Sequence, residues 1–324
     1  MEATALPIFR DQLLDRRHKL LAAAATRGGA EEVTRLLQEV DSALGRLNAG
    51  TFGLCATCHE AIEPDRLLAD PLTRFCLDHL TPVEQRALQQ DLDLAARIQR
   101  ELLPKPDVPL DGWELAYHYQ PAGPVSGDYC DLIHGNGDQV YFLIGDVAGK
   151  GVAAAMLMSH LSAMLRTLIS VDLPLSQLME RASRVFCEHT LPMHYATLVC
   201  GRASSSGEIE VCNAGHPSPL VIRAGEITRL EATGLPIGMF CSERFSSQTF
   251  RLTPGDLLLL CTDGLLEAQN AADEEYGIER LAALAASAPW RPHAIVDACL
   301  RDLTAFRGAA GSHDDLTILA VSRL

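Results

Sequence analysis

The 324-residue sequence predicts an α+β protein, with two packed antiparallel sheets flanked by helices and a smaller helical module in front of them. Two observations predict the larger part: short apolar strands follow one another in hairpin-like order, and helical segments occur in pairs between them. A third, two close pairs of metal-ligand residues near the N-terminus, predicts the separate module. We expect a helical hairpin or coiled coil over 1–50, a finger over 51–80, a linker helix over 81–106 and the large domain over 107–324.

Composition and charge exclude several classes of protein. Acidic residues outnumber basic ones by 42 to 27, the net charge is -15, and no basic block is visible, so nucleic-acid binding is disfavoured. Residues 1–12 lack a signal-peptide pattern, and the longest apolar run, 152–165, is too short to span a bilayer. The ten cysteines do not form a disulfide framework, and those outside the finger are expected to be buried reduced thiols. These observations indicate a cytoplasmic protein without a membrane partner.

Two helices are predicted before the finger. The first covers about 9–27, has leucines on one side at 13, 14, 20 and 21, and ends at Gly28-Gly29. The second starts near Ala30, and its apolar residues at 33, 37, 40, 44 and 47 alternate in steps of four and three. A short glycine turn between two such helices predicts an antiparallel hairpin, and pairing with another chain stays open.

The finger is predicted from four ligand residues. Cys55-x₂-Cys58 is followed, after seventeen residues, by Cys76-x₂-His79. Two such pairs supply four tetrahedral ligands to a structural zinc ion, with no position left open for catalysis. Residues 48–68 around the first pair resemble the zinc finger of the DksA/TraR family, which inserts an acidic coiled-coil tip into RNA polymerase. The turn at 26–30 of this chain lacks that acidic tip.

A third helix follows the finger. Thr81 is the expected cap, Pro82 suits the first turn, and Pro104 and Pro106 stop the helix after Leu103. Its apolar residues form a narrow stripe, made of Leu88, Leu92, Ala95, Ile98 and Leu102. A stripe of this width suits pairing with a second helix, so a homodimer through the linker helix is a further expectation.

The large domain is predicted to alternate strands and helices. Helices are expected over 152–170, 175–189, 278–287 and 292–306. Short apolar, β-branched runs predict strands over 113–119, 129–133, 140–144, 196–201, 209–213, 220–223, 248–252, 257–261 and 316–321.

Aspartates gather where predicted strands end. Asp128, Asp146 and Asp263 each lie beside a glycine, and Asp314-Asp315 precedes the last strand. Carboxylates at strand ends can point into a cleft where hard cations such as Mg²⁺ and Mn²⁺ bind. We expect Asp146 to bridge two cations beside the Val147 carbonyl. Asp128, Asp263 and one of Asp314 and Asp315 would complete the ligand set.

Five ordered motifs carry a family resemblance. They are Ser126-Gly127-Asp128, Gly145-Asp146-Val147-Ala148-Gly149-Lys150-Gly151, Asn213-Ala214-Gly215-His216, Cys261-Thr262-Asp263-Gly264-Leu265-Leu266-Glu267 and Asp314-Asp315-Leu316-Thr317. Together they resemble the metal-dependent phosphatases of the PP2C class (PPM), specifically the bacterial branch of RsbU and SpoIIE, over residues 113–324. The resemblance implies an α-β-β-α sandwich, Asp314 as the ligand, and two Mn²⁺ or Mg²⁺ ions per active site. Its implied substrate is a phosphorylated anti-sigma-factor antagonist of a partner-switching pathway.

The predicted function is therefore a serine/threonine protein phosphatase, and two alternatives stand beside it. One is a zinc-finger adaptor of the transcription machinery with an inactive phosphatase-like domain. The other is a nucleotide hydrolase, which the scarcity of Arg and Lys near the acidic motifs disfavours. Three further residues are weaker candidates: Asp131 as an acceptor near the site, His216 as a proton donor and Lys150 as a phosphate contact.

Overall fold

The computed structural model describes residues 6–27, 31–80, 82–105, 112–190, 194–287, 290–308 and 314–324. The chain separates into two compact units, Met1–Asp91 and Leu92–Leu324, and each is described by itself. Helix α4 (Pro82–Leu102) contributes residues to both units. The predicted cap Thr81, the predicted glycine turn at 28–30 and the predicted boundary at 106/107 lie outside the described residues.

The first unit is built around a helical hairpin. Arg17 donates to Asp41 (Nε to Oδ1, 2.7 Å) and Arg10 to Asn48 (3.0 Å), so the partners run in opposite directions along the two helices. The predicted antiparallel hairpin therefore forms within one chain. The elements of this unit are α1 (Leu6–Arg27), α2 (Glu31–Asn48), α3 (Pro64–Ala69), a 3₁₀ turn (Leu77–His79) and the first part of α4.

The hairpin and the finger share one apolar core. The rings of Phe9 and Phe52 lie 5.4 Å apart, and Leu13 and Val40 are buried in the same cluster as Cys55. The prediction that all four leucines of α1 face one side is wrong. Those at positions 14 and 21 are 47% and 44% exposed, because they follow the core-facing positions by one residue and so turn away by about 100°.

The second unit contains two five-stranded sheets, in which every strand pair is antiparallel. The strand orders are β1-β10-β9-β6-β7 and β2-β3-β4-β5-β8. The strands are β1 (Trp113–Gln120), β2 (Asp128–His134), β3 (Val140–Val147), β4 (Ala196–Ala203), β5 (Glu208–Ala214), β6 (Leu220–Arg223), β7 (Glu226–Arg229), β8 (Gln248–Arg251), β9 (Leu257–Cys261) and β10 (Leu316–Arg323).

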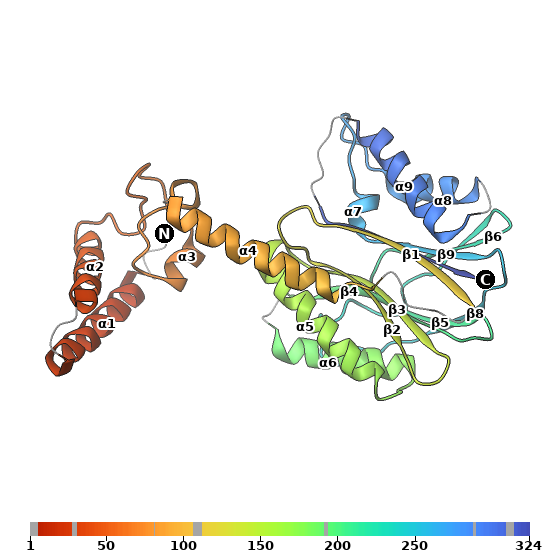
Figure 1. Ribbon diagram of the computed structural model, residues 1–324, viewed down its shortest axis with the longest axis horizontal. Helices are drawn as coiled ribbons and strands as arrows, with labels where there is room; N and C mark the ends of the chain where they lie inside the picture. The colour runs from red at the N-terminus through yellow and green to blue at the C-terminus, as the bar shows by residue number, and fades with distance from the viewer. Residues whose placement is uncertain are drawn as a thin grey trace. The chain divides into compact units, whose positions relative to one another are not determined.

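The sheets pack face to face and each carries helices on its outer face (Figure 1). Phe142 and Val199 of one sheet share a buried cluster with Leu258 and Leu319 of the other. Two further clusters join one sheet to its helix pair: the β2-β3-β4-β5-β8 sheet to α5 and α6, and the other sheet to α8 and α9. The predicted α-β-β-α sandwich is thereby confirmed. The helices are α5 (Gly151–Ile169), α6 (Leu175–His189), α7 (Asp263–Leu266), α8 (Gly277–Ala286) and α9 (Pro292–Arg307).

Helix α5 is longer than the apolar run that marked it in the sequence. With 19 residues it meets, by length and composition alone, the requirements for a membrane-spanning helix. In the structure one side of it is buried, and Met158, Leu161 and Leu165 lie in the core cluster beneath the β2-β3-β4-β5-β8 sheet. Its apolar character therefore has an explanation in the packing of the sandwich.

The part of α4 that lies in the second unit does not present its predicted stripe to the sheet. Ile98 is 56% exposed, whereas the neighbouring Gln99 is buried. The Gln99 amide donates to the Ser126 carbonyl (2.6 Å), and its oxygen accepts from the Ser126 N–H (3.0 Å). A polar side chain thus fixes α4 beside the turn that leads into Asp128, and apolar side chains of the stripe are left exposed.

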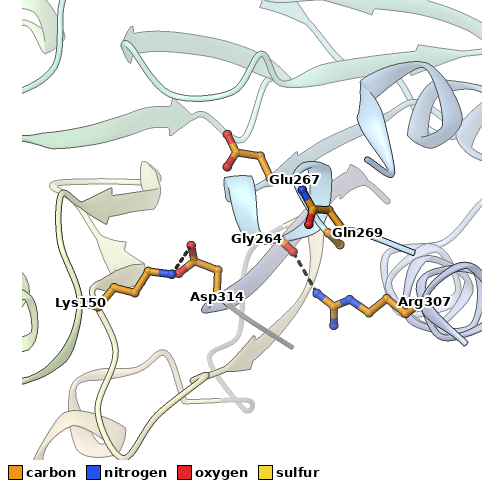
Figure 2. Close-up of a pocket in the computed structure, with 7 residues that line it drawn as sticks. Lys150, Gly264, Glu267, Gln269, Arg307 and Asp314 are labelled. Atoms are coloured by element: carbon orange, nitrogen blue, oxygen red, sulfur yellow. Dashed lines mark hydrogen bonds and ion pairs between the residues drawn. The ribbon is translucent and has the colours of Figure 1, made fainter. Parts of the chain in front are cut away.

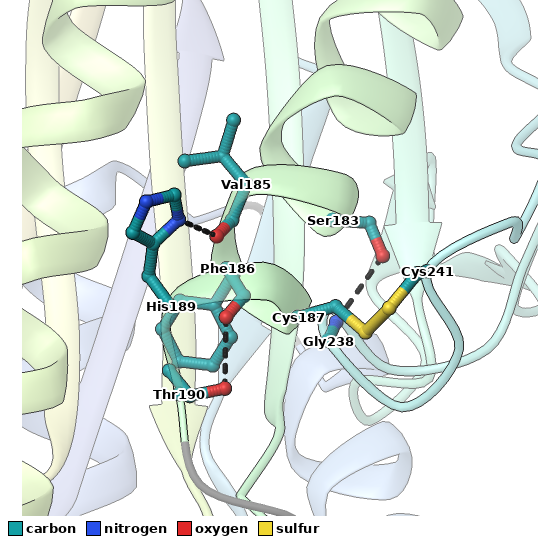
Figure 3. Close-up of a disulfide and its surroundings, with 8 residues drawn as sticks. All are labelled: Ser183, Val185, Phe186, Cys187, His189, Thr190, Gly238 and Cys241. Atoms are coloured by element: carbon teal, nitrogen blue, oxygen red, sulfur yellow. Dashed lines mark hydrogen bonds between the residues drawn. A yellow bond between two sulfur atoms is a disulfide. The ribbon is translucent and has the colours of Figure 1, made fainter.

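The cysteine prediction is wrong for one pair. Cys187 at the end of α6 and Cys241 in the loop before β8 form a disulfide, with 5.3 Å between their Cα atoms (Figure 3). The sequence could not reveal this pair, because the two residues are 54 positions apart and no motif links them. The remaining eight cysteines are free.

The disulfide is expected to stabilise the second unit measurably. Closing a loop of this length lowers the entropy of the unfolded chain, and typical gains are about 2–4 kcal/mol. Urea unfolding monitored in the sheet should therefore shift to lower urea when a phosphine reductant is added. The double variant Cys187→Ser/Cys241→Ser is the control and should ignore the reductant. Equal reductant sensitivity in the two proteins would contradict this role.

Candidate active site

Two of the predicted aspartates are direct neighbours across β2 and β3. Asp128 begins β2 and pairs in register with Asp146 near the end of β3. The turn before β2 closes on the same place, because the Val147 N–H donates to the Gly127 carbonyl (3.2 Å). Gly127 leaves little room for a side chain there, since an added Cβ would lie 3.3 Å from the Asp146 carboxylate and 3.1 Å from the Val147 oxygen.

Asp128 is buried, and residues of the other sheet hold its carboxylate by hydrogen bonds. Its Oδ2 accepts hydrogen bonds from the hydroxyls of Thr262 (3.0 Å) and Thr317 (2.5 Å). Burial raises its pKa, the two threonine hydroxyls oppose that rise, and the nearby Asp146 charge adds to it. The carboxylate therefore joins the two sheets at the point where the motifs converge.

Asp263 arrives from the opposite sheet on the short helix α7, which starts directly after β9. The sequence did not predict α7, because four residues are too few to show a helical period. Gly264 is required by close approach: a Cβ there would lie 1.8 Å from the Asp315 carbonyl oxygen. This contact seats Asp263 beside the Asp314-Asp315 segment.

The structure separates the roles of Asp314 and Asp315, which the sequence could not. Asp315 is buried, and its two carboxylate oxygens accept from the N–H groups of Ala122 (2.7 Å) and Gly127 (2.8 Å). Asp314 is half-exposed, and its Oδ2 accepts from the Lys150 ammonium (3.0 Å). Asp315 therefore holds the turn before Asp128, whereas Asp314 pairs with Lys150 and lines a pocket.

The electrostatics of the cluster favour bound cations. Burial raises the pKa of Asp146 to about 8, and repulsion from Asp263, Asp314 and Asp315 contributes to the shift. Burial and the Asp314 charge also raise the pKa of Asp263. Several carboxylates that repel one another in one place match the oxygen-rich donor sets that Mg²⁺ and Mn²⁺ prefer. The residues present thus fit a site for divalent cations.

The raised pKa of Asp146 gives a testable pH dependence. In metal-free protein the folded state keeps a proton that the unfolded chain loses near pH 4, so this stabilisation is full below pH 4 and is lost as the pH rises through about 8. In chelator, Asp146→Asn should therefore raise the melting temperature at pH 8, by about 2–4 °C for each kcal/mol of stability gained. At pH 4 it should change the melting temperature little. Saturating Mn²⁺ should reverse the order. A shift that does not depend on pH would contradict the argument.

A pocket opens beside this cluster (Figure 2). The side chains of Lys150 and Arg307 lie on opposite sides of Asp314 in this view. The lining residues are Lys150, Gly264, Glu267, Ala268, Gln269, Arg307 and Asp314. Sequence reasoning missed Arg307 and Gln269, because neither lies in one of the aspartate motifs.

The contacts of the two other weaker candidates, Asp131 and His216, indicate structural roles. Asp131 is fully buried and receives a bidentate pair from Arg166 of α5 (2.7 and 2.6 Å) together with the Tyr129 hydroxyl (2.9 Å). It therefore ties α5 to β2. His216 is buried, its Nδ1 pairs with the Thr197 hydroxyl (2.9 Å), and burial lowers its pKa to about 3. A histidine that stays neutral at physiological pH is unsuited to donate a proton.

In the first unit the four predicted finger ligands come together. The ligand atoms of Cys55, Cys58, Cys76 and His79 all lie within 4.8 Å of one another. The Cys58 and Cys76 sulfurs are 3.7 Å apart, and Cys76 Sγ lies 3.2 Å from His79 Nδ1. Three thiols and one imidazole at this spacing suit a tetrahedral ion such as zinc.

The sequence and the fold are similar to those of known proteins. The chain is 27% identical to Protein IcfG of Synechocystis over 72% of this chain and 41% of that protein. It is 29% identical to the phosphoserine phosphatase RsbP of Bacillus subtilis, over 55% of this chain and 46% of that protein. The chain thus spans less than half the length of these two relatives. Among solved structures, the RsbU and RsbW domains of Rv1364c from Mycobacterium tuberculosis are 31% identical, with a TM-score of 0.57 over 66% of this chain and 62% of that one.

Two family models cover different parts of the chain. The prokaryotic dksA/traR C4-type zinc finger matches residues 50–78, which include three of the four clustered ligands. The fourth, His79, follows the matched segment and gives this finger three cysteines and one histidine. The model of Stage II sporulation protein E (SpoIIE) matches residues 136–324, which is more than half of the chain and includes three of the four aspartates that converge at the site. The chain therefore belongs to the SpoIIE family.

Proposed function

We propose that this chain is a metal-dependent protein phosphatase that hydrolyses phosphoserine or phosphothreonine. One observation carries the proposal: in a SpoIIE-family sandwich, Asp146, Asp263 and Asp314, far apart in sequence, lie close enough for their charges to repel one another, and Asp314 lines a pocket. An isolated aspartate caps a helix or turn, but a mutually repelling set beside an opening suits cation-assisted hydrolysis.

The cations would be held by Asp146, the Val147 carbonyl, Asp263 and Asp314. The buried Asp128 would complete the ligand set. When bound, two Mn²⁺ or Mg²⁺ ions supply an activated water and neutralise the charge of the phosphoryl group. The chain's own residues set the positions. Thr262 and Thr317 fix the Asp128 carboxylate, Asp315 fixes the backbone of Gly127, and Lys150 orients Asp314.

The substrate proposed is a phosphorylated regulatory protein, specifically an anti-sigma-factor antagonist of a partner-switching pathway. Support comes from RsbP, which is named a phosphoserine phosphatase, and from the RsbU-like domain that shares a chain with an RsbW domain in Rv1364c. The finger would hold one structural zinc ion and act in regulation. A cytoplasmic location belongs to the same proposal: the eight free cysteines favour it, and the Cys187–Cys241 disulfide, a bond that is rare in reducing compartments, counts against it.

The test is hydrolysis of p-nitrophenyl phosphate by the full chain, first stripped with chelator and then supplied with Mn²⁺. The proposal expects turnover that depends on Mn²⁺. The adaptor alternative, in which the domain is inactive, expects none at any metal concentration. That alternative has one specific observation in its favour, the match of residues 50–78 to a dksA/traR finger.

We also propose that α4 mediates self-association. Leu94 and Ile98 are 48% and 56% exposed on this helix, in the part that belongs to the second unit. Ile98→Glu should weaken self-association and shift basal turnover, the latter by about 5- to 150-fold, the range of typical coupling free energies. Sedimentation and turnover are the measurements. Gln90→Glu, which adds the same charge at an exposed polar position of α4, is the control. If Ile98→Glu behaves like this control, the helix is only a tether.

A further inference from the structure

Arg307 stands out among the pocket residues because its charge is not neutralised. It is the last residue of α9 and half-buried, and its Nη2 donates to the Gly264 carbonyl (3.2 Å). Within the described parts of the second unit, no carboxylate forms an ion pair with it. Residues 309–313, which follow it, contain no acidic residue. Its Nε is buried without a hydrogen-bond partner in the described structure.

This arrangement costs desolvation free energy unless an anion binds the Arg307 guanidinium. A half-buried guanidinium without a carboxylate has lost part of its water and gained little in return, and burial accordingly lowers the pKa of Arg307. Two other arginines of this unit have a carboxylate as partner: Arg166 pairs with Asp131 and Arg202 with Glu210. Arg307 instead lines the pocket next to the aspartate cluster.

The position of Arg307 connects it to the reaction centre. The carbonyl that it contacts belongs to Gly264, the residue directly after Asp263, and both Gly264 and Asp314 line the same pocket. Figure 2 shows the guanidinium turned toward Gly264, on the side of Asp314 away from Lys150. The Lys150 ammonium already has the Asp314 carboxylate at 3.0 Å. Of these two cations in the pocket, Arg307 is therefore the one better placed to bind an anionic ligand.

We propose that Arg307 is a substrate-binding residue whose guanidinium holds an oxyanion of the phosphorylated substrate in this pocket. The planar fork of an arginine matches phosphate and carboxylate oxygens with two parallel hydrogen bonds. The oxyanion is either the phosphoryl group itself or the carboxylate of an acidic residue next to the phosphoserine. This inference rests on the proposed phosphatase function and assigns a group that binds its substrate.

The test compares Arg307→Met and Arg307→Lys with Arg301→Met, which removes a charge from an exposed position of the same helix. Full-length proteins with matching melting temperatures are assayed on p-nitrophenyl phosphate and on phosphoserine peptides with neutral or acidic neighbours. Each assay gives kcat and KM. Inhibition by inorganic phosphate and the Mn²⁺ concentration for half-activation are measured in parallel.

If the phosphoryl group is the ligand, Arg307→Met should raise KM for every substrate and the phosphate inhibition constant by about 10- to 100-fold, the value of a charged hydrogen bond. kcat and half-activation by Mn²⁺ should change little, the lysine variant should recover part of the loss, and Arg301→Met should match wild type. A rise in KM confined to peptides with acidic neighbours would assign the oxyanion to the neighbouring carboxylate.

Two results would overturn the inference. One is an unchanged KM and phosphate inhibition in both variants. The other is a fall in kcat with a higher Mn²⁺ requirement and no change in KM, which is what a residue that only positions Gly264 would give. Failure of the proposed function is a separate result, seen as wild-type protein without Mn²⁺-dependent turnover. In that case calorimetric binding of inorganic phosphate decides: loss in Arg307→Met supports the subsite, and equal binding rejects it.

Discussion

Asp146→Asn is expected to lower Mn²⁺-dependent turnover on a phosphoserine peptide by at least about 10²-fold, the scale on which single charge-stabilising groups act in active sites. Asp146 lies in register with Asp128 and is repelled by Asp263 and Asp314, so it occupies the centre of the carboxylate cluster. An amide at this position cannot hold a cation with the charge that the carboxylate supplies. Asp263→Asn should give a loss of similar size.

The fold should survive both changes. Neither carboxylate is an acceptor for the threonine hydroxyls that connect the two sheets, a role that belongs to Asp128. Asp297→Asn removes one negative charge from an exposed position of α9 and is the matched control. Near-normal turnover in either active-site variant, with the fold intact, would remove these aspartates from the reaction.

Loss of the finger's metal is the second change expected to have a large effect. We expect about one tightly held zinc per chain, and Cys58→Ala/Cys76→Ala should abolish it. Structural zinc contributes about 10–16 kcal/mol to the folding of small metal-dependent modules, more than the apolar cluster around Phe52 and Ile62 can replace. Residues 50–80 should therefore unfold, while the second compact unit keeps its sheets.

Metal analysis combined with hydrogen exchange measures both parts of this expectation. Peptides from 50–80 should lose protection in the double variant, and peptides from β3, β4 and β9 should keep theirs. His59→Asn is the control: His59 adjoins Cys58 but is outside the four-ligand cluster, and asparagine tolerates its positive φ of 61°. Equal zinc content in wild type and the double variant would refute the ligand assignment.

The architecture could be predicted from the sequence because its signals are local. Buried strands such as β3 and β9 are short apolar runs, and α6 shows a clear helical period, so the sandwich and the order of its layers followed. The short strand β7 (Glu226–Arg229) was missed, since its two β-branched residues lie between two charged ones and only one of the four is apolar. The finger ligands were found for the same reason as the strands: their spacing in sequence is itself the signal.

The rest of the site depends on contacts between distant segments. The role of Asp315 became visible only when its oxygens were found to accept from the N–H groups of Ala122 and Gly127, which are 193 and 188 residues away. The contact of Arg307 with Gly264 and the Cys187–Cys241 disulfide also depend on where the ends of helices lie relative to distant loops. On α4, the apolar stripe gave no sign that the polar Gln99 would be the buried residue, held by the backbone groups of Ser126. Specific hydrogen bonds of this kind leave no periodic trace in a sequence.

The most direct test of the central claim is a Mn²⁺ titration of the chelator-stripped full chain, with phosphate release from a phosphoserine peptide and bound Mn²⁺ measured in the same samples. The aspartate cluster predicts negligible release without metal. It also predicts a rise that saturates as about two ions bind, the number used in two-metal hydrolysis. Phosphate release that does not depend on metal, or no release when the protein is saturated with Mn²⁺, would contradict the assignment of this cluster as the catalytic centre.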